Sequence, residues 1–200
     1  MASRHSIAQA REVSPWLARF DAVLRPGLRA LELGCGLGHD AGELSAFGLA
    51  VCALDCEQAR VARAHEEAPS AMLLVADLAR TLPFSGEAFD LVVASLSLHY
   101  FDRETTSRIV AEIARVLRPE GRLLCRVNAV GDVLHGYGQG AAREPELFEV
   151  APGRTKRFFT PESLTAFLQP GFVIDELTPR LAWTDTGEKR TLECLARRRG

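Results

Sequence analysis

The segment Leu31-Glu32-Leu33-Gly34-Cys35-Gly36-Leu37-Gly38-His39-Asp40 decides the fold. Apolar side chains over 29–33 predict a short strand, and residues 40–46 predict the helix that follows it. Three glycines, at alternate positions from Gly34 to Gly38, fill the turn between them. Glycine adopts positive φ and lets a ligand approach the backbone closely. We therefore expect a strand–turn–helix unit with a ligand site at the turn.

The rest of the chain alternates the same two kinds of segment. Further strands are expected at 49–54, 72–75, 89–94 and 122–127, and helices at 57–67, at 103–117 and from Pro161 onward. Continuous apolar strands separated by helices are typical of a parallel sheet that is buried on both faces. Two final strands, at 172–177 and 191–196, are joined through Asp185-Thr186-Gly187, which favours an antiparallel pair. The sequence therefore predicts an α/β fold.

The 200 residues are expected to form one domain, because a chain of this length suits a single compact core. Residues 1–27 are expected to form an N-terminal helical segment, with a helix over 5–25 that ends at Pro26-Gly27. Residues 128–159 differ from the rest, because they are rich in glycine and show no long apolar period. We expect an excursion there that acts as a substrate lid and is mobile until substrate binds. A rigid surface excursion is the alternative.

The composition excludes several function classes. Lys and Arg together number 24 against 26 Asp and Glu, so the formal net charge is −2. A nucleic-acid-binding protein usually carries a basic surplus, so no nucleic acid partner is expected. No apolar run approaches the roughly 18 residues of a membrane span, and neither end resembles a targeting signal. The five cysteines are irregularly spaced and form no CxxC pair, which indicates reduced thiols rather than a metal site. We therefore expect a cytoplasmic protein without a metal.

A second acid, Asp55, follows the expected strand at 49–54 and lies 19 positions after Gly36. A carboxylate at this point can accept hydrogen bonds from both ribose hydroxyls of a nucleoside. Its alternative role is only to cap the next helix. The glycine spacing is G-x-G-x-G, and His39 stands where a dinucleotide-binding turn has its third glycine. Because Glu32 would repel a pyrophosphate, the pattern favours a nucleoside ligand that carries positive charge.

Six motifs, in chain order, resemble those of the class I S-adenosylmethionine-dependent methyltransferases. They lie at 32–38, 53–55, 76–78, 89–94, 112–121 and 159–164, so the resemblance extends over about residues 28–198. It implies a three-layer αβα Rossmann-like sandwich. The central sheet would have seven mostly parallel strands in the order 3-2-1-4-5-7-6, with only strand 7 antiparallel. The closing hairpin further resembles that of small-molecule, tellurite-resistance-type methyltransferases.

The resemblance assigns cofactor-binding roles by position. It implies that S-adenosylmethionine is bound by Glu32, Gly34, Cys35, Gly36, Gly38, Asp55, Cys56, Asp77, Leu78 and Ser95. The glycine turn would line the cleft, Glu32 would support that turn, and Asp55 would hold the ribose hydroxyls. Asp77 would accept a hydrogen bond from the adenine amine, and Ser95 would lie near the methionine part. Cys56 departs from the family pattern, because many relatives have a bulkier apolar residue against adenine.

The activity that the resemblance implies is transfer of a methyl group to a small-molecule nucleophile by in-line displacement. His99 and Tyr100 follow the fourth expected strand, where this family often has substrate contacts, and they are the candidate catalytic residues. A packed aromatic corner is the alternative reading of this pair. His135 and Tyr137 are the next candidates for a base. Two other functions stay open: a non-catalytic subunit that binds the cofactor and, less favoured, a nicotinamide-dependent oxidoreductase.

Overall fold

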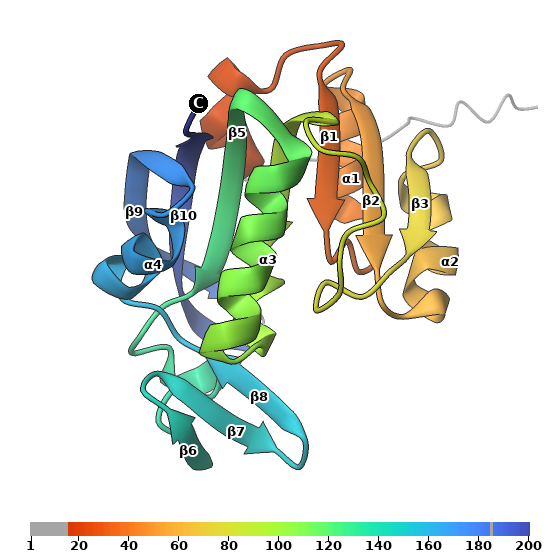
Figure 1. Cartoon of the computed structure of the whole chain (residues 1–200). Helices are drawn as coiled ribbons and strands as arrows, with labels where there is room; N and C mark the ends of the chain where they lie inside the picture. Colours follow the sequence, from red (N-terminus) through yellow and green to blue (C-terminus); the bar gives the residue numbers. More distant parts are fainter. Residues whose placement is uncertain (1–15, 185) are drawn as a thin grey trace, which may run out of the picture.

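The computed structural model describes residues 16–184 and 186–200. Its centre is a seven-stranded sheet with the strand order β3-β2-β1-β4-β5-β10-β9 (Figure 1). Neighbouring strands are parallel except where β10 pairs with β5 and with β9. The strand order and the single antiparallel strand are those that the sequence predicts. The α/β fold class is therefore confirmed.

Strands and helices alternate along the chain as expected. The strands of the main sheet are β1 (Arg29–Leu33), β2 (Ala50–Asp55), β3 (Met72–Val75), β4 (Phe89–Ser95), β5 (Leu117–Asn128), β9 (Phe172–Thr184) and β10 (Gly187–Arg198). The helices are α1 (His39–Ala46), α2 (Gln58–Glu67), α3 (Arg103–Val116) and α4 (Pro161–Leu168), with short 3-10 turns η1 (Leu17–Val23), η2 (Leu98–Tyr100) and η3 (Val133–His135). Within the described residues, no helix is long and apolar enough to cross a membrane.

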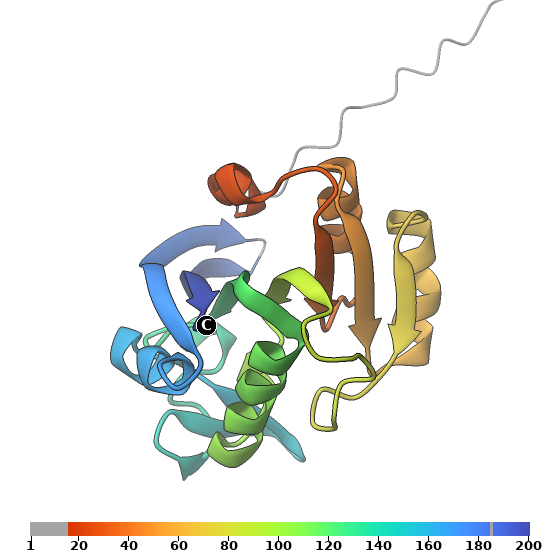
Figure 2. The same cartoon turned by 45° about the horizontal axis from the view of Figure 1, so that its top comes forward.

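Helices cover both faces of the sheet, which gives the expected three layers (Figures 1 and 2). Two buried clusters fill the spaces between the layers, one containing residues of α3 and α4 and the other residues of η1, α1 and α2. Strand β4 contributes to both clusters, because Val92 belongs to the first and its neighbours Leu91 and Val93 to the second. Successive strand residues point to opposite faces. This explains why β4 is a continuous apolar run in the sequence.

The N-terminal segment differs from the prediction. A long helix was expected over 5–25, but in the described part the chain forms only the 3-10 turn η1, with non-helical φ and ψ of −115° and 20° at Phe20. Residues 5–15 of the expected helix lie outside the described residues. The rings of Trp16 and Phe20 pack edge to face with centroids 6.1 Å apart, and both are buried. The apolar pattern that suggested a helix therefore comes from contacts with the core.

Strand β5 is longer than expected, because it begins at Leu117 rather than at residue 122. The segment Pro119-Glu120-Gly121, between the expected helix and the expected strand, forms an irregularity within β5. The pairing of β4 with β5 shifts register between Phe89 and Leu91, and Glu120 has a positive φ of 63°. The hairpin of β9 and β10 is antiparallel, as predicted, and its pairing extends to Thr184 and Gly187.

The excursion contains strands that the sequence did not predict. Strands β6 (Ala141–Glu144), β7 (Leu147–Ala151) and β8 (Arg154–Arg157) form a separate three-stranded antiparallel sheet. These strands have only four or five residues, and only β7 is largely apolar, so no apolar alternation marks the sheet. They are joined to η3 by an aromatic cluster of Tyr137, Phe148 and Phe158, with centroids 5.5–6.1 Å apart. Figure 1 shows this sheet beyond the edge of the main sheet to which β1, β2 and β3 point.

We expect Gly38→Ala to lower the free energy of unfolding more than Gly27→Ala. Both glycines have a left-handed φ, +85° and +84°, so both substitutions carry the same backbone strain of about 1–2 kcal/mol. A Cβ on Gly38 would lie 2.9 Å from the Cβ of Ala64 in α2, whereas a Cβ on Gly27 would meet nothing within 4 Å. This overpacking should add about 1–3 kcal/mol. Urea unfolding measures both losses, and equal losses would contradict the close packing of the glycine turn on α2.

Candidate functional site

A cleft of about 570 Å³ lies at the edge of the sheet where the parallel strands end. Ligands of such α/β sheets bind beyond the carboxyl ends of the strands, and clefts of about 300–1,000 Å³ suit small molecules. Segments that follow β1, β2, β3 and β4 form most of the wall, together with one residue of β8. The lining residues are Gly34, Asp55, Cys56, Glu57, Arg60, Asp77, Leu78, Leu96, Ser97, Tyr100, Phe101 and Arg154.

Backbone hydrogen bonds hold the glycine turn against β2. The N–H groups of Gly34 and Cys35 both donate to the carbonyl oxygen of Leu54, at 2.8 and 2.9 Å. A Cβ on Gly34 would lie 2.7 Å from the Cβ of Ser97, so close packing requires glycine there. A Cβ on Gly36 would meet nothing within 4 Å. Gly36 therefore faces open space, and a ligand can approach the backbone at this position.

Asp55 joins the glycine turn to the start of α2. One of its carboxylate oxygens accepts a hydrogen bond from the N–H of Gly36 and the other from the N–H of Glu57, each at 2.9 Å. The side chain lines the cleft but is otherwise buried. Each carboxylate oxygen has two lone pairs, so each can accept a further hydrogen bond from a ligand. The alternative role as a cap for α2 accounts for the contact with Glu57 but not for the contact with Gly36.

Glu32 lies in β1, two residues before the turn, and is buried. Burial, and then the negative charge of Asp40, raise the pKa of the Glu32 carboxyl well above its usual value. Its Oε2 atom has no hydrogen-bond partner among the described residues. Because buried polar atoms are nearly always paired, this oxygen indicates a contact with a water or ligand group. A cationic group near the turn would be stabilised by this carboxyl in its charged form.

Five of the ten residues expected to bind the cofactor line the cleft: Gly34, Asp55, Cys56, Asp77 and Leu78. They come from the ends of β1, β2 and β3, which neighbour one another in the sheet. The Asp77 carboxylate is oriented by the N–H of Ala79, which donates to its Oδ1 at 2.9 Å. Partial burial, and then the charge of Asp55, raise the pKa of the Cys56 thiol, so this exposed cysteine stays protonated near neutral pH.

The other five do not line the cleft: Glu32, Cys35, Gly36, Gly38 and Ser95. Gly36 adjoins it through the hydrogen bond to Asp55. Burial, and then the charge of Glu32, raise the pKa of the Cys35 thiol to about 12. The Ser95 hydroxyl accepts hydrogen bonds from Nε and Nη2 of Arg126, at 3.2 and 2.8 Å. Ser95 is therefore engaged with β5 rather than with the cleft.

Sequence reasoning missed a third of the cleft wall, namely Glu57, Arg60, Leu96 and Ser97. Leu96 has a φ of +52°, which is uncommon for a residue other than glycine and is typical of functional sites. The buried hydroxyl of Ser97 has no partner among the described residues. Both residues directly follow β4, and this position could have identified them as cleft residues. The prediction for this position included only Ser95. Arg154 reaches the cleft from β8, a strand that the sequence did not predict.

His99 and Tyr100 lie side by side in η2, with ring centroids 4.2 Å apart. Tyr100 lines the cleft and is 47% exposed, whereas His99 is buried. Burial, and then the positive charges of Lys189 and Lys156, lower the pKa of the His99 imidazole to about 3. A general base works best with a pKa near the operating pH. The geometry therefore supports a contact role for Tyr100 and does not support His99 as a general base near neutral pH.

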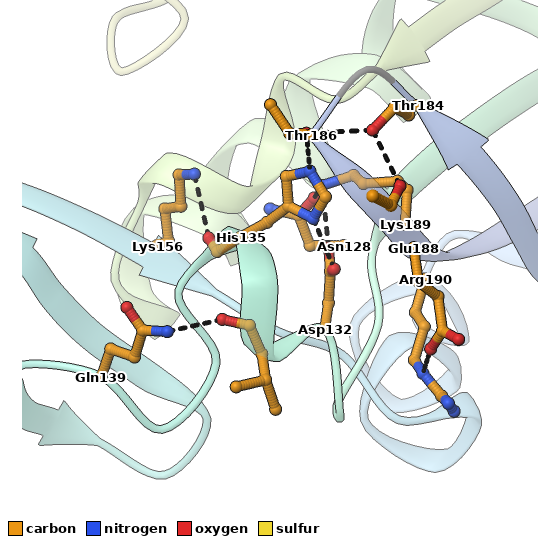
Figure 3. Close-up of polar contacts among 12 residues, drawn as sticks. Asn128, Asp132, His135, Gln139, Lys156, Thr184, Thr186, Glu188, Lys189 and Arg190 are labelled. Carbon is orange, nitrogen blue, oxygen red and sulfur yellow. Dashed lines mark hydrogen bonds and ion pairs between the residues drawn. The ribbon is translucent and has the colours of Figure 1, made fainter.

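The two further candidates for a base are engaged elsewhere. His135 Nδ1 lies 2.7 Å from Asp132 Oδ1, and His135 Nε2 lies 3.0 Å from the hydroxyl of Thr186 (Figure 3). Tyr137 packs in the aromatic cluster of the small sheet. Neither residue lines the cleft. His135 thus connects η3 to the start of β10, and Tyr137 stabilises the small sheet.

We expect the buried His99 to make the stability of the protein depend on pH below about 6.5. An imidazole titrates near that value in the unfolded chain, but at about 3 in the folded protein. Between these values the unfolded state binds a proton that the folded state does not. The free energy of unfolding therefore falls as the pH falls, by up to about 1.4 kcal/mol per pH unit.

Urea unfolding from pH 7 to pH 4 tests this expectation on the wild type and on His99→Gln. The variant lacks the titrating group, so its stability should depend less on pH. His39→Gln, which removes a largely exposed imidazole, is the matched control. If wild type and His99→Gln lose stability in parallel over this range, the account of His99 is wrong.

Comparison with known proteins agrees with this geometry. Residues 31–125 match a family model described as a methyltransferase domain, and this range contains the glycine turn, Asp55, Asp77 and Tyr100. Malonyl-[acyl-carrier protein] O-methyltransferase from Methylococcus capsulatus is 39% identical over 102 residues, which make up 49% of this chain and 36% of that protein. The chain thus spans about a third of the length of this relative.

Solved structures share the fold over nearly the whole chain. A SAM-dependent methyltransferase from Methanosarcina mazei superposes with a TM-score of 0.76 at 24% identity, over 90% of this chain and 97% of that one. The 1,6-didemethyltoxoflavin-N1-methyltransferase of Burkholderia thailandensis, solved with S-adenosylhomocysteine, has a TM-score of 0.75 at 21% identity, over 94% of this chain and 78% of that one. Residues 31–125 therefore match a methyltransferase domain, and the chain shares the fold of solved S-adenosylmethionine-dependent methyltransferases.

Proposed function

We propose that the protein transfers the methyl group of S-adenosylmethionine to a small-molecule nucleophile by in-line displacement. The observation that carries this proposal is the Asp55 carboxylate, which lines the cleft with both oxygens fixed by the N–H groups of Gly36 and Glu57. A fixed carboxylate after the second strand can accept hydrogen bonds from ribose hydroxyls. The methyltransferase domain at residues 31–125 supports the same cofactor.

The charges near the glycine turn suit this cofactor better than a dinucleotide. Glu32 and Asp55 lie close enough for the charge of Asp55 to raise the pKa of Glu32. The Asp55 carboxylate, together with Glu32 in its charged form, would repel a pyrophosphate but attract the sulfonium and ammonium groups of S-adenosylmethionine. The unpartnered Oε2 atom of Glu32 is a further oxygen available to such a ligand, directly or through water. The oxidoreductase alternative is therefore disfavoured.

When bound, S-adenosylmethionine supplies a methyl group on a sulfonium, and the displaced product is a neutral thioether. The residues of this chain then have to align the acceptor and exclude water. Leu96 and Ser97 form the wall after β4, and Tyr100 and Phe101 add aromatic surface beside it. We propose that Tyr100 contacts the acceptor. His99, held neutral by burial and by the neighbouring lysines, is proposed to shape this wall rather than to accept a proton.

The size of the cleft and the charge of the chain support a small-molecule acceptor in place of a nucleic acid. One similar structure holds the small molecule 1,6-didemethyltoxoflavin, which supports this class of acceptor, whereas another relative is named for malonyl-[acyl-carrier protein], so the relatives do not point to one compound. We also propose a cytoplasmic location. It is supported by the five cysteines, which are all free thiols in the structure.

The proposal includes a lid formed by residues 128–159. Arg154 of β8 lines the cleft, so closure of this segment would reach the acceptor. Strand β8 limits which part moves, because the Thr155 hydroxyl donates to the carbonyl oxygen of Tyr100 at 2.9 Å and Arg157 Nε to that of Phe101 at 3.4 Å. The mobile part is therefore proposed to be the glycine-rich start of the segment, where residues 131, 136, 138 and 140 all have positive φ.

Amide hydrogen exchange tests the lid. We expect residues 131–140 to exchange faster than β7 and β8 when only S-adenosylhomocysteine is bound, and to become protected once an acceptor is added. Closure over the acceptor removes these amides from water. Equal protection of residues 131–140 with and without the acceptor would show that the segment is a rigid part of the wall.

We expect Asp55→Asn to weaken binding of S-adenosylhomocysteine by roughly 10- to 100-fold. Hydrogen bonds to a charged group contribute about 1.5–3 kcal/mol, and the neutral amide has only one acceptor oxygen to share between ligand and backbone. Calorimetry at a temperature where the variant is folded measures the affinity. Asp90→Asn is a matched control, because Asp90 also accepts a backbone N–H, from Arg29 at 2.7 Å, but lies at the start of β4. Wild-type affinity in Asp55→Asn would mean that Asp55 only caps α2.

The remaining alternative is a subunit that binds the cofactor without catalysis. Such a subunit would have the same cleft and the same affinity for the cofactor, so a binding measurement cannot distinguish it from an enzyme. Release of S-adenosylhomocysteine in the presence of candidate acceptors can separate them. The proposed function predicts release that depends on the acceptor, whereas the alternative predicts none with any acceptor.

A further inference from the structure

The chain contains 22 arginines but only two lysines, Lys156 and Lys189. The two lysines come from different sheets, Lys156 from β8 and Lys189 from β10, and meet in one region (Figure 3). The charge of Lys189 lowers the pKa of Lys156, after burial has done so, and both lysines lower the pKa of His99. Like charges repel, so bringing the only two lysines together requires an explanation.

The ammonium group of Lys189 has more hydrogen-bond and ion-pair partners than the ammonium group of Lys156. Lys189 Nζ donates to Asn128 Oδ1 at 2.6 Å and lies 2.9 Å from Oδ2 of the buried Asp132. Lys156 Nζ donates to one backbone oxygen, that of His135, at 3.1 Å. Arg154, two residues earlier in β8, adds a further positive charge that lowers the pKa of Lys156. Around Lys156, the positive charges of Lys189 and Arg154 therefore outnumber the one negative charge, that of the Asp132 carboxylate.

The same region holds polar atoms that have no partner. The Nδ2 group of Asn128 is buried and has no hydrogen-bond partner among the described residues, and the same holds for Nδ1 of His99. An ammonium group has three donors, and the backbone oxygen of His135 takes only one from Lys156. The unpaired amide donor of Asn128 is buried, which is unfavourable until an acceptor arrives, and the half-buried Lys156 places excess positive charge in the same region. An anion would satisfy both needs.

The region adjoins the cleft where β8 meets η2, since the Thr155 hydroxyl donates to the carbonyl oxygen of Tyr100 at 2.9 Å. Arg154 and Tyr100, near neighbours of Lys156 and His99 in the chain, both line the cleft. Asn128 ends β5, and its pairing with Thr191 puts the start of β10 beside it. In the strand order, β5 and β10 lie on the opposite side of β1 from β2 and β3, which carry the acidic residues. The lysines therefore lie on the acceptor side of the proposed site.

We propose that Lys156, Lys189 and Asn128 bind a carboxylate group of the methyl acceptor. This inference rests on the proposed function and narrows its substrate class to acceptors that carry a carboxylate. Two carboxylate oxygens can accept from Lys156 and from the Asn128 amide together, while Lys189 adds charge. At both positions lysine supplies a compact ammonium with three rotatable donors, which a carboxylate can approach as a point charge.

Binding of small carboxylates tests the proposal without knowledge of the acceptor. The probes are acetate, benzoate and malonate, each compared with its neutral amide, on protein saturated with S-adenosylhomocysteine. We expect at least one carboxylate to bind at least tenfold more tightly than its amide. Lys156→Met should remove this preference, whereas Arg108→Met, which removes an exposed positive charge from α3, should keep it. If no carboxylate is preferred, or if Lys156→Met keeps the preference, the proposal is wrong.

Titration of His99 by NMR gives a second readout that needs no variant. A carboxylate between the lysines would offset their charges, so the pKa of the His99 imidazole should rise when the preferred probe binds. An unchanged pKa would contradict the proposed position of the carboxylate. Calorimetry with S-adenosylhomocysteine alone distinguishes failure of this inference from failure of the proposed function. Cofactor binding without carboxylate preference overturns only this inference, whereas absence of cofactor binding overturns the proposed function.

Discussion

The carboxylate of Asp55 is the interaction on which the architecture of the site depends. By accepting the N–H groups of Gly36 and Glu57, it fixes the turn after β1 to the start of α2. The turn is also held from two other sides, since Gly34 packs on Ser97 and Gly38 on Ala64 with no space for a Cβ. Such a turn has little freedom left to lose when a ligand binds. This preorganisation is what a nucleoside site requires.

Charge divides the site into two halves. Carboxyl groups gather near β1, β2 and β3, where Glu32 is buried and Asp55 and Asp77 line the cleft. Positive charge gathers at β5, β8 and β10, where Lys156 and Lys189 lower the pKa of His99. A cationic cofactor is favoured in the first half and an anionic acceptor in the second. The same division would orient the two reactants toward one another across the cleft.

The sequence predicted the sheet because its strands are apolar on both faces, as the alternate packing of Leu91 and Val92 shows. Asp55 and the glycine turn were predictable because their spacing in the sequence is the spacing that a nucleoside-binding site requires. The small sheet was not, since β6 and β8 are short and polar and the sheet is held by Tyr137, Phe148 and Phe158, which are scattered in the sequence. Arg154 and the meeting of Lys156 with Lys189 depend on that sheet. Ser95 was chosen over Leu96 and Ser97 because a sequence does not reveal that β5 binds the Ser95 hydroxyl through Arg126.

The central claim is that S-adenosylmethionine binds along the glycine turn and Asp55. Titration of ¹⁵N-labelled protein with S-adenosylhomocysteine, followed by amide NMR, tests it most directly. The account predicts the largest shifts at Gly36 and Glu57, whose N–H groups bond to Asp55, and at Leu78, which lines the same cleft. Shifts confined to other parts of the sheet, or no shifts at saturating ligand, would contradict it.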